Sequence, residues 1–251
     1  MIVTFEHNHG TYRVDITKPL DISIALEASD KQPNAFYAPM FSAAPLQAGD
    51  FIGSTKAGSP VNFFNVQLNP HGNGTHTECV GHIAKETYTI NHCLQQFWFL
   101  ADLVSIYPEK QANGDRMITH EQLATALPDE LGDAVIVRTL PNEEEKKSRS
   151  YSGNNPPYMQ PEAMEWLRKR GVRHFLIDLP SVDREEDGGK LAAHKAFWNY
   201  PNEPRCASTI SELIFVPDEI KDGRYLLNIH IISLELDVSP SKPVLYAIQN
   251  H

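Results

Sequence analysis

Residues 69–82 read N-P-H-G-N-G-T-H-T-E-C-V-G-H, and the rest of the chain is interpreted around this stretch. Its reactive side chains are three histidines, one glutamate and one cysteine: His71, His76, His82, Glu78 and Cys79. Neutral imidazoles and carboxylates are the groups that bind divalent metals or transfer protons near neutral pH. Glycines allow backbone shapes in which such groups converge. The pattern favours a metal or proton-transfer site, and a polar surface loop is the alternative.

The spacing within the stretch selects particular residues. His76 and Glu78 are two residues apart, so in an extended strand both side chains project from the same face. His82 can join them after a turn. Open catalytic metal sites often combine ligands from one segment with ligands from distant strands. His194 and Glu212 are the distant candidates, because Glu212 lies in the otherwise apolar segment I-S-E-L-I-F, where a buried charge needs a partner. A sheet edge facing water is the alternative for Glu212.

Other chemistries have weaker support in the sequence. Cys79 could be a thiolate nucleophile activated by His76 or His82, although a small packing residue is the favoured interpretation. No G-x-S-x-G elbow, dinucleotide-binding glycine motif or phosphate-binding loop is present. Seven further histidines have no supporting cluster and are expected on the surface or satisfied in the core: His7, His9, His92, His120, His174, His230 and His251.

Composition limits the class of protein. The chain has 251 residues, 41% of them hydrophobic and 22% charged, which is typical of a globular protein with a substantial core. The formal net charge of −10 disfavours nucleic acid and membrane surfaces as partners. No apolar run is long enough to span a bilayer, and no signal peptide is recognised. Three cysteines without a C-x-x-C pair disfavour a disulfide scaffold, so we expect a cytoplasmic protein.

The hydrophobic pattern predicts one mixed α/β domain over residues 1–251. A helix at residues 161–170, followed by Gly171 and an apolar strand at 172–179, indicates a crossover between parallel strands. Further strands are expected at residues 12–26 in two pieces, 61–68, 99–106, 134–140, 210–215, 225–238 and 244–248, and further helices at 119–126 and 191–198.

Two segments lack a periodic pattern. Residues 29–60 are rich in Pro, Ala, Ser and Gly and are predicted to form a long loop or arm. The charge run E-E-E-K-K at residues 143–147 is interpreted as a solvated loop. Four aromatic residues are candidates for a substrate pocket, with core packing as the favoured alternative for at least two of them: Phe36, Tyr37, Phe63 and Phe64.

Several ordered motifs resemble one known family. G-T-H-T-E-C-V-G-H is similar to the signature H-x-G-T-H-x-D-x-P-x-H of the cyclase family, which includes bacterial kynurenine formamidase and isatin hydrolase. V-D-I-T-K-P-L near the start, the strand V-I-V-R-T and the segment W-L-x-x-x-G-V-x-x-x-x-I-D-x-P-S-x-D at residues 166–183 also match. His194 and Glu212 occupy the places of the later histidine and glutamate. The resemblance covers nearly the whole chain.

The resemblance implies a compact α/β fold with a β-barrel-like central sheet and flanking helices. It implies hydrolysis of a small amide, formamide or cyclic amide with one or two divalent ions, Zn or Mn, in a homo-oligomer such as a dimer or tetramer. By position, the resemblance makes His76 and Glu78 ligands of one metal. It makes Glu78, His194 and Glu212 ligands of a second. His82 would then transfer protons to and from a small-molecule substrate. The metal would activate the water molecule that attacks this substrate.

The sequence departs from the family signature at three positions. Gly72 stands where the family has its first histidine, and His71 is one residue away, facing the other side of a regular strand unless a bulge turns it inward. Glu78 replaces an aspartate, and Val80 replaces a proline. Three possibilities stay open: two metals, one metal on His76, Glu78, His194 and Glu212, or none. The functional hypotheses are a metal-dependent amide hydrolase and, alternatively, a catalytically silent relative that binds a small ligand.

Overall fold

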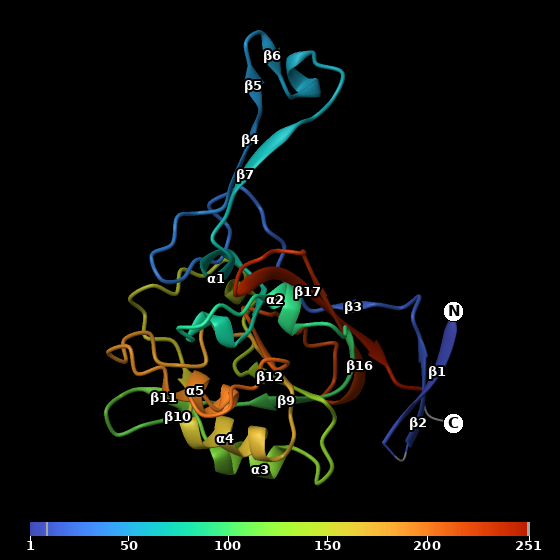
Figure 1. Ribbon diagram of the computed structural model, residues 1–251, viewed down its shortest axis with the longest axis vertical. Helices are drawn as coiled ribbons and strands as arrows, with labels where there is room; N and C mark the ends of the chain where they lie inside the picture. The colour runs from blue at the N-terminus through green and yellow to red at the C-terminus, as the bar shows by residue number, and fades with distance from the viewer. Residues whose placement is uncertain (9, 250–251) are drawn as a thin grey trace.

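Seven strands of a mixed sheet close into a barrel in the computed structural model of the chain, which describes residues 1–8 and 10–249 (Figure 1). The order is β16-β9-β12-β14-β15-β8-β17, and pairing of β16 with β17 closes the ring, while β3 extends β17 on the outside. Neighbours from β9 to β15 are parallel, and the other pairs are antiparallel. The predicted α/β fold with a barrel-like centre is confirmed. The bounds are β3 (Leu20–Asp21), β8 (His76–Glu78), β9 (Trp98–Ile106), β12 (Ala134–Thr139), β14 (His174–Ile177), β15 (Thr209–Glu212), β16 (Gly223–Ile231) and β17 (Val238–Ala247).

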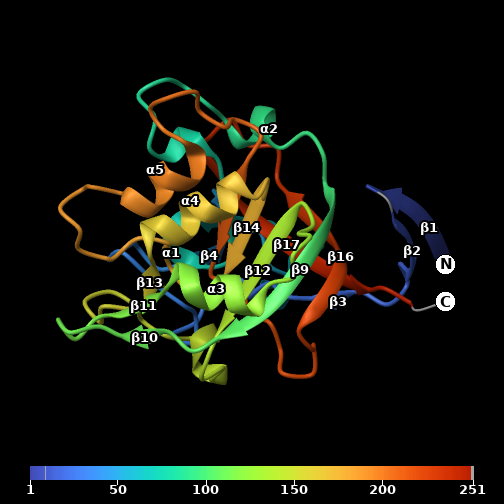
Figure 2. The ribbon, with the colours of Figure 1, turned by 90° about the horizontal axis from the view of Figure 1, so that it is seen from below.

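The strands separate two apolar layers. In β12 every residue is buried, and successive side chains point to opposite faces. Ala134 and Ile136 join the cluster inside the barrel, whereas Val135 and Val137 pack under the helices. Three helices cover that outer face, α3 (His120–Ala126), α4 (Pro161–Lys169) and α5 (Ala192–Trp198), as Figure 2 shows. A strand buried on both faces is typical of parallel sheets covered by helices.

Local signals explain where the helices begin and end. The Thr119 side chain accepts the backbone N–H of Gln122, and the Gln122 side chain accepts that of Thr119, which forms a capping box for α3. α4 begins with Pro161, whose missing N–H costs nothing in a first turn. It is followed by Gly171 with φ of 83°. The return strand β14 is parallel to β12, as predicted for a crossover.

Residues 42–67, which we call the arm, project from the body as a long antiparallel ribbon (Figure 1). β4 (Ser42–Pro45) pairs with β7 (Phe64–Gln67), and β5 (Gln47–Ala48) pairs with β6 (Phe51–Ile52) towards the tip, which also carries η1 (Thr55–Ala57). The sequence predicts a loop or arm over residues 29–60 and a strand at 61–68. The ribbon spans the junction of these two segments.

The remaining elements lie around the barrel. β1 (Ile2–His7) and β2 (Gly10–Asp15) form a hairpin near both ends of the chain. The others are α1 (Pro70–Asn73), η2 (Val80–His82), α2 (Ile90–Cys93), β10 (Glu109–Lys110), β11 (Arg116–Ile118), η3 (Glu144–Lys147) and β13 (Tyr158–Met159). Among the described residues, no helix has both the length and the apolar character that crossing a membrane requires.

Two sequence-based interpretations are wrong. The long strand predicted at residues 225–238 ends at Ile231, and residues 232–237 form a loop before β17. The charge run at residues 143–147 is not wholly solvated, because Lys146 is only 4% exposed. Its ammonium group donates to Asp178 at 2.8 Å and to the backbone oxygen of Thr139 at 2.5 Å. A helical turn in η3 directs this one lysine inward, which a count of charges does not reveal.

Candidate metal centre

The register between β8 and β15 fixes three of the predicted ligands. His76 lies opposite Glu212, and Glu78 lies opposite Ile210, so these side chains share one face of the sheet. Ile210 packs in the cluster under the helices, which places this face on the outside of the barrel. On the other face the hydroxyl groups of Thr77 and Ser211 form a hydrogen bond of 2.6 Å.

His76 is oriented by its own backbone. Its Nδ1 lies 2.9 Å from the carbonyl oxygen of Gly74, and since a carbonyl only accepts, Nδ1 carries the proton. Nε2 therefore carries a lone pair, and this atom lies 3.3 Å from Oε2 of Glu212. His76 is fully buried, and Nε2 has no hydrogen-bond partner among the described residues. Two acceptors that face each other in a buried site need a cation or a proton between them.

Glu78 and His194 form the buried centre of the cluster. Nε2 of His194 donates to Oε1 of Glu78 at 3.0 Å, while Nδ1 of His194 lies 2.6 Å from Asp183. Burial lowers the pKa of His194, but its hydrogen bonds to Asp183 and Glu78 outweigh burial and hold the pKa well above its ordinary value. Burial raises the pKa of Glu78, but the charges and hydrogen bonds of the histidines around it hold that pKa well below its usual range.

His71 reaches the cluster from a helical turn. The Asn69 side chain caps α1 by accepting the backbone N–H of Gly72, and Pro70 occupies its first turn. The expectation of a regular strand or a bulge at this point is therefore wrong. In the turn, Nδ1 of His71 lies 3.2 Å from Oε2 of Glu78, and its ring centre is 5.3 Å from that of His76.

Gly72 cannot carry the ligand that the family signature has at this position. A Cβ atom built on Gly72 would lie 2.4 Å from Cβ of Ala38 and 2.9 Å from the backbone oxygen of Ala35. Both neighbours belong to a tightly packed loop, in which Ala35 is buried. The neighbouring residue His71 reaches the cluster instead.

His82 and Asp237 border the exposed side of the cluster. Nδ1 of His82 lies 3.6 Å from Oε2 of Glu78 and 3.5 Å from Oδ2 of Asp237. The same Oδ2 accepts a hydrogen bond from Nε2 of His71 at 3.0 Å. Burial lowers the pKa of His71, but Asp237 and Glu78 raise it to about 10. Hydrogen bonds from His71 and His82 hold the pKa of Asp237 well below its usual range.

The cluster has the properties of a cation site. Oε2 of Glu78, like Nε2 of His76, is buried without a hydrogen-bond partner among the described residues. Three overlapping groups offer ligand atoms within 4.8 Å of one another: His71 with His76 and Glu78, His71 with His82 and Asp237, and Glu78 with His82 and His194. Imidazole nitrogen and carboxylate oxygen suit zinc and manganese alike. The residues present therefore fit a divalent metal.

The structure brings all five predicted site residues together: His76, Glu78, His82, His194 and Glu212. Sequence reasoning missed Asp237 and left His71 undecided. Asp183 ends the matched motif I-D-x-P-S-x-D, so a signal for it was present. Asp237 had no signal, because the segment that carries it was interpreted as strand.

A cavity of about 1040 Å³ opens over the cluster. His71, His82, His194 and Glu212 line its floor, and the acidic loop at residues 184–189 lines one side. The aromatic pair Phe36 and Tyr37 lines another side, and both residues are exposed with φ of 58° and 53°. The predicted aromatic pocket is therefore partly present. Phe63 and Phe64 belong to the exposed arm, and all four aromatic residues are exposed, so the expectation that at least two of them pack in the core is wrong.

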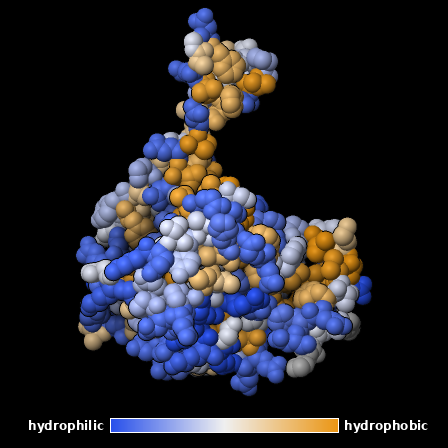
Figure 3. Space-filling view, in the orientation of Figure 1, coloured by the Kyte–Doolittle hydropathy of each residue, from blue (hydrophilic) through white to orange (hydrophobic). Residues whose placement is uncertain are grey.

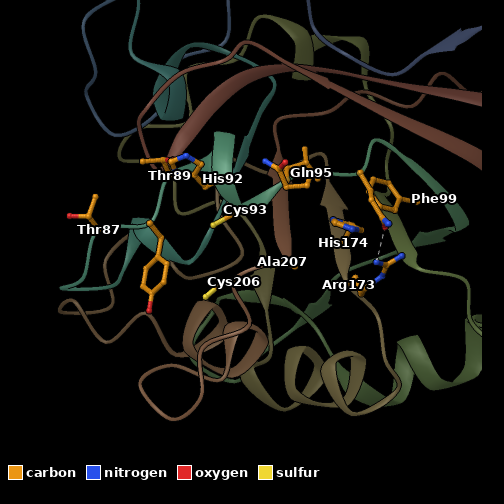
Figure 4. Close-up of a pocket in the computed structure, with 13 residues that line it drawn as sticks. Thr87, Thr89, His92, Cys93, Gln95, Phe99, Arg173, His174, Cys206 and Ala207 are labelled. Atoms are coloured by element: carbon orange, nitrogen blue, oxygen red, sulfur yellow. Dashed lines mark hydrogen bonds between the residues drawn. The ribbon is translucent and has the colours of Figure 1, made fainter.

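A second cavity of about 530 Å³ lies near the opposite ends of the parallel strands (Figure 4). His174, at the first position of β14, lines it together with Arg173, Cys93, Cys206 and Phe99. Burial lowers the pKa of His174 to about 3, so this imidazole is neutral. None of the described residues that line this cavity belongs to the histidine–carboxylate cluster, so the candidate site lies in the larger cavity.

Two of the histidines that the sequence left without a cluster, His9 and His251, lie outside the described residues.

Comparison with known proteins agrees with the motifs and the fold. A family model named Cyclase, with the description "Putative cyclase", matches residues 14–184. The chain belongs to the cyclase family. Among solved structures, it is similar to an isatin hydrolase bound to the product analogue thioisatinate, with 13% identity, a TM-score of 0.67, and coverage of 92% of this chain and 93% of the other.

Two further solved structures show the same fold. Isatin hydrolase A from Ralstonia solanacearum has 15% identity and a TM-score of 0.66, and covers 92% of both chains. A predicted metal-dependent hydrolase from Bacillus stearothermophilus has 18% identity and a TM-score of 0.63, and covers 91% of this chain and 98% of the other. At this identity the likeness concerns the fold, and the cyclase-family barrel is confirmed.

Proposed function

We propose that this chain is a metal-dependent hydrolase that cleaves the C–N bond of a small amide, formamide or cyclic amide. The observation that carries the proposal is the pair of buried acceptors without hydrogen-bond partners, Nε2 of His76 and Oε2 of Glu78. They lie against His71 and Glu212, which line an open cavity. The names of the similar solved structures, which include isatin hydrolases and a predicted metal-dependent hydrolase, support the same class of reaction.

The proposed metal ligands are His71, His76, Glu78, His194 and Glu212. A zinc or manganese ion held by them would supply a Lewis acid that activates water and polarises a carbonyl group. The protein contributes the orientation of these ligands. Gly74 holds the proton on Nδ1 of His76, and Asp183 does the same for His194, so that each Nε2 faces the carboxylates.

His82 is the proposed proton donor to the departing nitrogen. Its side chain is 29% exposed, it lines the cavity, and imidazole both accepts and donates protons near neutral pH. Asp237 faces Nδ1 of His82, which leaves Nε2 as the atom that exchanges a proton with the substrate. Asp237 is thus a proposed positioning residue for both His71 and His82.

The cavity walls indicate the class of substrate. Phe36 and Tyr37 offer aromatic faces, and the Tyr37 backbone N–H donates to Ser152, which helps to hold the left-handed backbone. Two adjacent non-glycine residues in this conformation are uncommon and occur at functional sites. The acidic loop that also lines the cavity disfavours anionic substrates. We infer a neutral or cationic aromatic amide as substrate, and a reducing cytoplasm as its compartment because the three thiols are free.

Metal analysis tests the proposal. Protein purified without chelators or a nickel column should contain at least about one equivalent of zinc or manganese and hydrolyse N-formyl aromatic amines. His82→Ala should abolish turnover and leave the metal content unchanged, because His82 is assigned to proton transfer. Loss of metal in that variant would make His82 a ligand instead. Protein with less than about half an equivalent and no hydrolysis would be a ligand-binding relative.

A further inference from the structure

The smaller cavity, of about 530 Å³, has a buried floor and a polar mouth. Its floor consists of residues that are 8% exposed or less: Cys93, Leu94, Phe99 and His174. Exposed polar side chains between residues 87 and 96 surround the mouth. Figure 4 shows the thiols of Cys93 and Cys206 on one side of the cavity and the rings of His174 and Phe99 on the other. A concave, largely apolar space of this size is the usual form of a small-molecule site.

His174 brings one unsatisfied nitrogen to this cavity. Its Nδ1 lies 2.8 Å from Oγ1 of Thr209, which stands opposite it on the neighbouring strand β15. Nε2 is buried and has no hydrogen-bond partner among the described residues. Because Nδ1 faces the neighbouring strand, Nε2 lies at the edge of the ring that is left to the cavity. A buried polar atom of this kind costs free energy until a partner bonds to it.

The imidazole of His174 is held in place by its neighbours. Its ring centre lies 3.9 Å from that of Phe99, with an angle of 39° between the two planes. The guanidinium group of Arg173 lies over the ring of Phe99, 5.6 Å from its centre. Arg173 is itself anchored to Asp133 at 2.8 Å and to Gln96 at 3.3 Å. The direction of Nε2 is therefore set before any ligand binds, which lowers the entropic cost of binding.

The groups that line the cavity do not fit a metal ion or a charged molecule. The thiols of Cys93 and Cys206 and the imidazole of His174 line the same space. Within the described part of the chain, however, they form no group of three ligand atoms within 4.8 Å of one another. Arg173 already pairs with Asp133, and burial lowers the pKa of His174 to about 3, so its imidazole is neutral. The floor thus offers no free charge to an ionic ligand.

We propose that this cavity binds a small neutral aromatic molecule that carries a hydroxyl group, as a phenol does. A neutral imidazole nitrogen either donates or accepts one hydrogen bond, and a hydroxyl group serves as its partner in both cases. The rings of Tyr88 and Phe99, together with the two thiols, supply apolar walls against which an aromatic ring packs. A cavity of about 150 Å³ is large enough for benzene, so this one has room for one or two rings.

The cavity differs from the other apolar surface that the fold leaves open. In the space-filling view, hydrophobic residues run along the arm, where Phe64 is 47% and Val66 is 61% exposed (Figure 3). A small molecule on that open surface would be contacted from one side, whereas the cavity surrounds its occupant and adds a directed hydrogen bond. Binding in the cavity does not depend on the proposed hydrolysis, because none of its described lining residues belongs to the histidine–carboxylate cluster.

Calorimetric titration of the intact chain with phenol and with toluene tests the proposal, because a methyl group in toluene replaces the hydroxyl group of phenol. Phenol should bind as a single molecule per chain. His174→Asn retains an amide group that can bond to Thr209 but removes Nε2. The ratio of phenol affinity to toluene affinity should therefore fall about tenfold in this variant. His230→Asn, at an exposed histidine of β16, is the matched control and should leave the ratio unchanged.

A second variant keeps the test decisive if His174→Asn misfolds. Ala207 lines the cavity and is exposed, so Ala207→Trp should fill part of the space without disturbing the core. This variant should bind both probes at least about tenfold more weakly than the intact chain. Ala124→Trp, at an exposed position of α3 outside the cavity, is its control and should bind both probes as the intact chain does.

Several results would overturn the proposal. One is an intact chain that shows no binding by calorimetry or by saturation-transfer NMR at about 10 mM phenol, which would leave water as the occupant. Another is phenol binding that Ala207→Trp does not weaken, which would place the phenol elsewhere on the chain. An affinity ratio that is unchanged in folded His174→Asn would show that Nε2 does not bond to the hydroxyl group.

Discussion

The histidine–carboxylate cluster and the arm both depart from the usual rule that polar side chains are exposed and apolar ones are buried. The cluster buries polar side chains, and the arm exposes apolar ones. The cluster places His76 and Glu78 at 0% exposure, and the arm leaves Phe64 and Val66 about half exposed. Buried polar groups without partners cost free energy, and so do uncovered apolar faces. In the cluster the missing partner is not part of the described chain, which is why we assign a cation to it. Departures from the usual pattern mark function when nothing within the chain compensates for them.

A third region shows what compensation within the chain looks like. Lys146 and Asp178 are as buried as the cluster, and their charges lie 2.8 Å apart. The ammonium group also bonds to Thr139 and Asn142, and Asp178 accepts the backbone N–H of Thr139. Neither residue has an unpartnered side-chain atom among those described. Burial of charge therefore does not by itself indicate a ligand site, whereas several buried ligand atoms that converge without hydrogen-bond partners do.

Glu78→Gln should have the largest effect and would sharpen the contrast between cluster and arm. Loss of the central carboxylate should abolish stoichiometric metal binding, measured by elemental analysis. The metal-free variant should be less stable than the metal-free parent, because the buried His194 loses the carboxylate to which it donates. Glu186→Gln, a carboxylate that lines the same cavity outside the cluster, is the control and should retain metal.

Lys146→Met should lower the free energy of unfolding by about 3–5 kcal/mol at neutral pH, because Asp178 is left buried without its cation. Burial raises the pKa of Asp178 although Lys146 opposes this, and the substitution raises it further. A raised carboxyl pKa stabilises the folded state below the unfolded pKa, and this contribution is lost as the pH rises through the folded pKa. The deficit should therefore shrink on acidification.

Urea denaturation at several pH values measures the Lys146→Met deficit. Lys147→Met is the control, since that side chain is 44% exposed and its loss should change stability by less than about 0.5 kcal/mol. A Lys146→Met deficit that does not depend on pH would contradict the assignment to Asp178.

The exchange His71→Gly with Gly72→His moves the histidine to the position that it has in the family signature. We expect the exchange to weaken metal binding by about a hundredfold, as much as His71→Ala does, because any side chain at position 72 collides with Ala38. Metal affinity is measured by competition with a chromophoric chelator. Binding as tight as that of the intact chain would show that the loop around Ala38 adjusts to a side chain at position 72, and that a histidine at either position can bind the metal.

Asp237→Asn should have the smallest effect on the metal, a loss of affinity of about tenfold to a hundredfold, because it orients His71 without belonging to the buried centre. The same competition assay applies. Glu235→Gln, an exposed carboxylate in the same loop, should bind metal as the intact chain does. An Asp237→Asn variant that loses metal altogether would show that Asp237 is a metal ligand and not a positioning residue.

Much of the fold could be predicted from local pattern. The crossover from α4 to β14 followed from an amphipathic run, a glycine and an apolar run, and these signals are local. The loop that carries Asp237 could not be predicted, because its apolar and polar residues alternate like those of a strand. The burial of the Lys146 side chain could not be predicted either, because a helical turn within a charged run has no apolar periodicity.

The sequence by itself predicted the family and five residues of the candidate site, because ordered motifs identify a family and even spacing reports which side chains share a face of a strand. The barrel followed only as an implication of that resemblance. Only the tertiary structure decided where the His71 side chain lies. A one-residue shift reverses the direction of a side chain in a strand but not in the capped turn that Asn69 begins. Only the folded chain also brought Asp237 to within 3.0 Å of His71, across 166 positions of sequence. Contacts between distant segments depend on how elements pack, and no local pattern encodes them.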